Sequence, residues 1–173
     1  MKYFAKASLS SLVALSLLPA TAQAATYSPT GSGSVVPTTV QVKKGIILNC
    51  VLNANIVSDG TIQTNVGPSI PLPNGTRITS LTIPPGDPLC SLVSFAGLPY
   101  KVQANSATEV EFIDVRVTGV TGNCRGNLKA DLVGGVLKFT HTKSTIPSDP
   151  PGGSSCSIQG NVPTNPTASF SYP

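Results

Sequence analysis

Hydrophobic and polar residues alternate along most of the chain beyond residue 34. In segment 46–56 one face would carry Ile46, Leu48, Cys50, Leu52, Ala54 and Ile56. In segment 123–132 the corresponding face would carry Cys124, Gly126, Leu128, Ala130 and Leu132. A period of two is typical of a β-strand with one buried face. Sixteen prolines and sixteen glycines interrupt these runs too often for long helices. The sequence therefore predicts an all-β protein.

The alternation changes phase once, within segment 108–117. Apolar residues occupy even positions up to Phe112 and odd positions from Ile113 onward. A slip of one residue moves every later side chain to the other face of a strand. We therefore expect a β-bulge, or a strand buried partly on both sides, near Phe112 and Ile113.

A longer pattern occurs twice around the four cysteines. Each copy has an alternating strand with a cysteine, a turn, a second strand, a proline-rich loop and a Cys-Ser-aliphatic triplet. The first copy contains Cys50, Asp59-Gly60 and Cys90-Ser91-Leu92, and the second contains Cys124, Gly134-Gly135 and Cys156-Ser157-Ile158. This repetition predicts a single two-layer antiparallel β-sandwich built from two related hairpin units, 45–100 and 119–173. A β-solenoid would need more and shorter repeats.

The first 24 residues have the features of a secretory signal. Lys2 and Lys6 precede a short apolar run, Leu9 to Leu18, which Ala22-Gln23-Ala24 follows as a cleavage site. We expect cleavage after Ala24, with Ala25 as the neighbouring alternative. The run is shorter than the roughly 20 residues that span a bilayer, and no later segment is apolar enough to do so. Residues 25–34 are small and polar, which predicts a flexible lead-in to a β-sandwich domain at 35–173.

Export favours oxidised cysteines, and four cysteines allow three pairings. Three of them, Cys50, Cys124 and Cys156, share the phase of buried positions. Zinc ligation is the competing interpretation, but the chain has neither CxxC nor HxxxH spacing. Shorter loop closure favours the pairs Cys50–Cys90 and Cys124–Cys156, although the repeat itself is compatible with all three pairings.

The sequence contains no convincing catalytic, metal or cofactor site, and we expect the protein not to be an enzyme. The only histidine, His141, falls at the end of an apolar strand face. Glu109 and Glu111 alternate onto one strand face, where a solvated pair is a plainer interpretation than a glycosidase or calcium site. Asn74-Gly75-Thr76 matches a glycosylation sequon, but an Asn-Gly turn explains it equally well. The net charge of +4, which loss of Lys2 and Lys6 would lower by two, is too small and scattered for nucleic-acid binding.

The predicted surface is weakly charged, since only 10% of the residues are charged. Outward positions on the first cysteine strand include Ile47 and Val51 beside Asn49 and Asn53. A partly apolar face of this kind is expected of proteins that adhere, self-associate or meet a nonpolar phase. A second packed layer would have the same pattern. Ile47 and Val51 are our candidates for an apolar surface.

Several short motifs together resemble a known family. They are Cys90-Ser91-Leu92, Gly97-Leu98-Pro99-Tyr100, Gly122-Asn123-Cys124, Leu128 and Cys156-Ser157-Ile158-Gln159-Gly160. The chain resembles the secreted bacterial protein activators of alkane oxidation of the PraA/PraB type. Tyr100 stands where that family usually has tryptophan. The charged segment 109–116 and the loop 147–153 also depart from it.

The resemblance implies a non-enzymatic secreted protein at hydrocarbon–water or cell-surface boundaries, which promotes alkane use by dispersing or contacting oil. Its partner would be a hydrocarbon or lipid surface. The alternative is an adhesin or biofilm fibre subunit that self-associates through strand edges. The segment Val35 to Val40 is the candidate edge, although Pro37 removes one donor from it.

Overall fold

The computed structural model describes residues 25–65, 69–84 and 88–173. The predicted signal sequence lies outside these residues. The described chain forms fifteen strands and one short 3₁₀-helix. They are β1 (Ala25–Ser28), β2 (Gly31–Val35), β3 (Thr38–Lys44), β4 (Ile46–Ser58), β5 (Thr61–Thr64), β6 (Arg77–Thr82), η1 (Cys90–Leu92), β7 (Ser94–Ala96), β8 (Tyr100–Ala104), β9 (Glu109–Gly119), β10 (Gly122–Val133), β11 (Val136–Phe139), β12 (Thr145–Ile146), β13 (Ser148–Asp149), β14 (Cys156–Asn165) and β15 (Ser169–Phe170).

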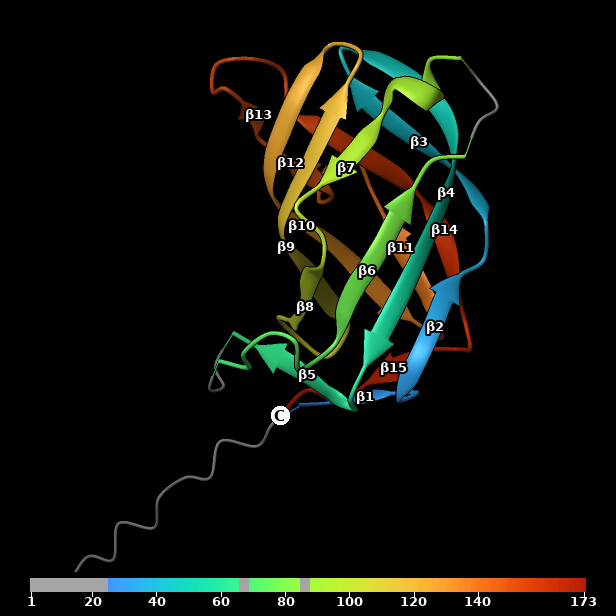
Figure 1. The fold of residues 1–173 in the computed structure, drawn as a ribbon, viewed down its shortest axis with the longest axis vertical. Helices are drawn as coiled ribbons and strands as arrows, with labels where there is room; N and C mark the ends of the chain where they lie inside the picture. The colour runs from blue at the N-terminus through green and yellow to red at the C-terminus, as the bar shows by residue number, and fades with distance from the viewer. Residues whose placement is uncertain (1–24, 66–68, 85–87) are drawn as a thin grey trace, which may run out of the picture.

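Eight of these strands close into a barrel, with further strands outside it (Figure 1). Around the ring the order is β8, β6, β4, β2, β14, β11, β10 and β9, and the pairing of β8 with β9 completes the circle. The all-β prediction is confirmed. However, the strands form a closed barrel rather than two clearly separate layers. Alternation could not distinguish the two, because both architectures bury one face of each strand.

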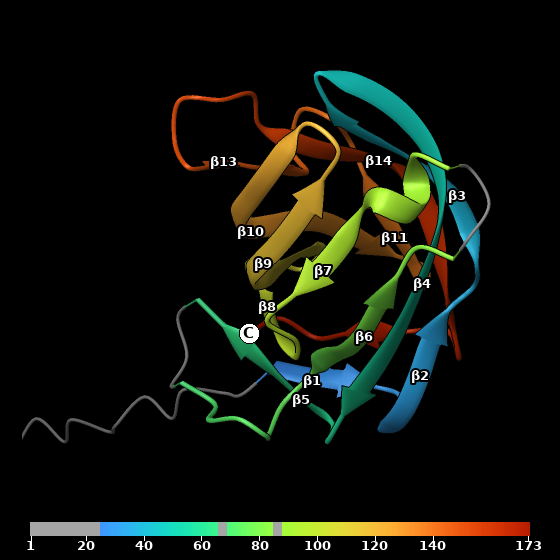
Figure 2. The same ribbon diagram turned by 45° about the horizontal axis from the view of Figure 1, so that its top comes forward.

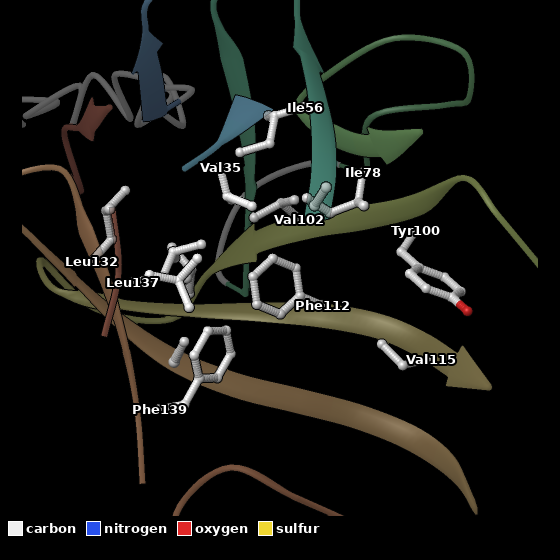
Figure 3. Packing of buried hydrophobic residues seen from close by; sticks show 14 of the residues in the cluster. Val35, Ile56, Ile78, Tyr100, Val102, Phe112, Val115, Leu132, Leu137 and Phe139 are labelled. Carbon is white, nitrogen blue, oxygen red and sulfur yellow. The ribbon is translucent and has the colours of Figure 1, made fainter. Parts of the chain in front are cut away.

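The inward faces follow the predicted phase. Cys50, Leu52, Ala54 and Ile56 of β4 are buried, as are Cys124, Ala130 and Leu132 of β10. Figure 3 shows side chains from opposite walls converging on one interior, with Phe112 and Phe139 stacked at a ring-centroid distance of 6.2 Å. The hydrophobic core is therefore the inside of the barrel.

The predicted irregularity in β9 is confirmed as a bulge. Gly126 pairs with Val115 and Leu128 with Phe112, so two residues of β9, Ile113 and Asp114, lie opposite a single residue of β10. Asp114 has a φ of 54°, and its backbone N–H donates to the Asn127 side chain at 3.1 Å. The extra residue restores the phase, so both Phe112 and Val115 point inward.

Strands β2 and β3 continue one another across residues 36–37, and both lie between β4 and β14. The segment Val35 to Val40 is therefore not a free edge, which corrects the expectation that it could pair with another subunit. The strands that end the sheet, β15 and β7, contain two and three residues. Such short edges give little backbone for pairing between chains.

One end of the barrel is covered by β1, β5 and β15 (Figures 1 and 2). The structure places residues 25–34, which the sequence predicts to be flexible, in β1 and most of β2. Ala25 and Tyr27 alternate with polar residues, and both are buried. The small, polar composition of the segment did not indicate this inward-facing pair. Burial raises the pKa of Tyr27 to about 12.

Two disulfides join strands to their surroundings. Cys50–Cys90 links β4 to η1, and Cys124–Cys156 links β10 to β14, strands that β11 separates in the ring.

The two sequence copies do not form equal hairpins. Strand β11 folds back on β10, whereas β5 leaves β4 and pairs with β1 and β8.

Candidate functional site

The end of the barrel opposite β1, β5 and β15 is formed by two hairpin turns that meet. The Lys44 ammonium of the β3–β4 hairpin donates to the carbonyl of Asn123 at 2.7 Å and to the hydroxyl of Ser148 at 3.2 Å. In return, the Thr121 hydroxyl of the β9–β10 turn donates to the Lys44 carbonyl at 2.5 Å. These bonds hold together two turns that are distant in the sequence.

An apolar mouth opens beside these turns, with a cavity volume of about 80 Å³. Its walls come from strands β3, β4, β7, β9, β10, β12 and β14 and from the turns at this end of the barrel. The lining residues are Val42, Lys43, Lys44, Ile46, Leu48, Val93, Phe95, Val115, Val117, Gly119, Val120, Thr121, Leu128, Ile146, Cys156, Ser157 and Ile158. Most are aliphatic, so the mouth offers a nonpolar surface with few hydrogen-bonding groups.

A second cavity of about 50 Å³ lies deeper in the barrel. Four residues, Phe95, Val115, Leu128 and Ile158, line both the mouth and this inner cavity. The inner wall also includes Tyr100, whose hydroxyl donates to the carbonyl of Ala96 at 2.6 Å. That hydroxyl is thereby occupied, and the ring contributes to the cavity wall.

Exposed aliphatic side chains surround the mouth. Ile46 and Val120, which line it, are 41% and 44% exposed. Ile47, next to Ile46 at the start of β4, is 55% exposed. Val51 lies on the same outer face of β4 and is 37% exposed. Ile47 and Val51 are thus exposed on the outer face of β4, beside the mouth but outside its lining.

Sequence reasoning pointed to exposed residues on the outer face of β4 but missed the mouth itself. Ile46 and Leu48 continue the inward phase of β4 beyond the buried positions, yet they line the mouth instead of the core. The available signal was their position directly after the Gly45 turn, because inward residues at a strand end lie at the rim of a barrel. The partner strands could not be identified from this signal alone.

The other candidate residues have structural partners. Glu109 accepts from Lys143 at 2.8 Å and Lys129 at 3.1 Å, and the hydrogen bond from Lys143 lowers its pKa to about 2. Glu111 shares the amide of Asn105 with Glu109. This polar cluster lies at the end of β9 remote from the mouth, and its partly exposed ion pairs contribute only modestly to stability.

His141 and the sequon are also accounted for by local contacts. The His141 Nδ1 atom lies 2.9 Å from the Ser157 hydroxyl. In the sequon, Thr76 is buried and its hydroxyl donates to the Thr61 carbonyl at 2.7 Å. Within the described part of the chain, no group of three or more His, Cys, Asp or Glu side chains could hold a metal ion.

No helix among the described residues has the length and apolarity needed to cross a membrane.

The family model described as alkane oxidation protein activator PraA/PraB-like matches residues 1–172. The chain belongs to this family. An activator is a description that fits a non-enzymatic role. No curated protein and no solved structure gives a significant match.

Proposed function

We propose that this family member is a secreted, non-enzymatic protein that promotes alkane use by contacting hydrocarbon with the apolar end of its barrel. The observation that carries the proposal is that Ile46 and Val120 are exposed at an apolar mouth, with Ile47 exposed next to Ile46 on the outer face of β4. The family description, an activator of alkane oxidation, supports alkanes as the nonpolar substance that is contacted. The disulfides support an oxidising compartment outside the cytoplasm.

Adsorption would remove these exposed side chains from water. Full burial of an isoleucine or valine side chain is worth about 1.5–3 kcal/mol. Ile47 and Val120 are 55% and 44% exposed, so each could contribute about 1 kcal/mol on reaching oil. Together, about 2 kcal/mol corresponds to about a thirty-fold change in the adsorption equilibrium.

The basic residues at this end are compatible with contact at an oil surface. The Lys44 ammonium is held by acceptors at the junction of the turns. Lys43 is exposed, and a lysine can keep its ammonium in water while its methylene chain covers nonpolar surface. Neither residue requires a charge to enter the oil.

The test is the interfacial tension of a hexadecane–water boundary in the presence of the mature protein. The double variant Ile47→Asp and Val120→Asp should lose most of the activity of the unmodified protein, because it places charges at the mouth and beside it. The matched control is Leu72→Asp with Val133→Asp, whose original side chains are 46% and 43% exposed but lie in the β5–β6 loop and at the other end of β10. Equal loss in both variants, or no surface activity in the unmodified protein, would refute the proposal.

A further inference from the structure

The mouth and the inner cavity, together termed the path, are adjacent nonpolar spaces. They share the side chains of Phe95, Val115, Leu128 and Ile158, so these four residues form the boundary between the two spaces. Phe95 and Leu128 are only partly buried, whereas Val115 is almost fully buried. The boundary is therefore made of side chains, and a change in their rotamers would connect the two spaces.

The lining of this path favours an occupant without polar groups. A buried water needs two to four polar partners to be held in a cavity. Among the described residues, the buried side-chain polar atoms without a hydrogen-bond partner are Asn53 Oδ1 and His141 Nε2, and neither residue lines the mouth or the inner cavity. Inside the barrel an occupant would therefore meet aliphatic and aromatic carbon.

The size of the path limits the cross-section of the occupant. The two spaces, of about 80 and 50 Å³, exceed the roughly 10–15 Å³ that one water requires. They are arranged in series with the four shared residues between them. An unbranched chain has a smaller cross-section than a branched isomer of equal mass, so it needs a smaller displacement of these four side chains. The interior of an eight-stranded barrel is either filled by side chains or holds one small ligand.

We infer that the barrel binds a single unbranched alkyl chain, which enters at the mouth and places its end in the inner cavity beyond Phe95, Val115, Leu128 and Ile158. This inference rests on the proposed function and adds to it a saturable site for one hydrocarbon molecule. The uncharged alkane is favoured over a fatty acid, because the Lys44 ammonium is already bonded to protein acceptors. Lys43 also lines the mouth. It is therefore the residue that would bind the carboxylate if the occupant were a fatty acid.

The experiment follows the methyl resonances of Ile, Leu and Val in the mature protein by NMR during titration with n-hexane. Saturable shifts at Val115, Leu128 and Ile158 are expected. The ligand control is neohexane, an isomer of n-hexane with a wider cross-section, which should leave the inner methyl groups unshifted. Hexanoate forms the third arm. Tighter binding of hexanoate than of n-hexane, lost in Lys43→Met, would overturn the assignment to an uncharged chain.

Variants separate internal binding from adsorption. Ala54→Phe should fill the inner cavity and abolish the saturable shifts while interfacial activity remains, because Ala54 lines the inner cavity and not the mouth. Val117→Phe, which narrows only the mouth, should weaken binding and serves as the second variant if Ala54→Phe does not fold. Shifts confined to Ile47 and Val120 that never saturate would overturn the inference and leave the adsorption proposal standing. Saturable binding by a protein without interfacial activity would instead refute the adsorption proposal and retain the internal site.

Discussion

Replacing Gly135 by alanine should destabilise the protein far more than the same change at its neighbour Gly134. Both glycines belong to the β10–β11 turn and have positive φ angles, 59° at Gly134 and 76° at Gly135. A Cβ atom at Gly134 would meet nothing within 4 Å, whereas one at Gly135 would lie 2.4 Å from Cγ2 of Thr167. The Gly135 carbonyl also accepts from the N–H and hydroxyl of Thr164, each at 2.8 Å. Movement away from Thr167 would therefore disturb these bonds.

The magnitudes follow from the two kinds of cost. A left-handed backbone conformation costs alanine about 1–2 kcal/mol at either position. The steric overlap at Gly135 adds about 1–3 kcal/mol, as overpacking does elsewhere in proteins. We therefore expect Gly134→Ala to lower the free energy of unfolding by about 1 kcal/mol and Gly135→Ala by about 3 kcal/mol. With a urea m-value of about 2 kcal/mol/M, the midpoints should fall by about 0.5 and 1.5 M.

The assay is urea unfolding of the disulfide-intact mature protein, followed by far-UV circular dichroism because the chain has no tryptophan. Thr167→Ala removes the Cγ2 atom, so combining it with Gly135→Ala should recover most of the excess loss. Such recovery would appear as coupling in a double-mutant cycle. Equal losses at the two glycines, or no coupling with Thr167→Ala, would refute the steric argument.

Three further predictions concern the covalent links, acid stability and one buried hydroxyl. Thiol titration of the protein under denaturing, non-reducing conditions should find no free thiol. The disulfides close loops with sequence separations of 40 and 32. Replacing both cysteines of either pair should therefore lower the free energy of unfolding by about 4 kcal/mol, which urea unfolding would measure. Because the pKa of Glu109 is lowered to about 2 from 4.5, chiefly by Lys143, its stabilising contribution should be complete above pH 4.5 and decline as the pH falls towards 2; Glu109→Gln should make acid unfolding less steep in this range, and an unchanged profile would contradict the assignment. Tyr100→Phe removes the donor to the Ala96 carbonyl and should lower the melting temperature through a loss of about 1–2 kcal/mol. The control Tyr172→Phe, which removes an exposed hydrogen bond, should change stability by about 0.5 kcal/mol or less.

The alternation of residues was sufficient to predict the class of the fold and much of its inward face. Cys50, Leu52 and Ile56 are buried in their predicted phase, because the geometry of a strand sends successive side chains to opposite sides whatever it pairs with. The bulge near Phe112 was predictable for the same reason, since a local change of phase requires a local extra residue. These features depend on neighbouring residues of one strand.

The closed barrel and its mouth depend on tertiary structure. The ring is closed by pairings such as β2 with β14, whose partners Val35 and Thr164 are far apart in the sequence. The mouth likewise combines Ile46, Phe95 and Val120 from separate strands and turns. A strand of alternating pattern can pair with many others, so sequence periodicity fixes which face is buried but not which strand lies beside it. Where Ile46 lies relative to Val120 was therefore decided only when the strands closed into a ring.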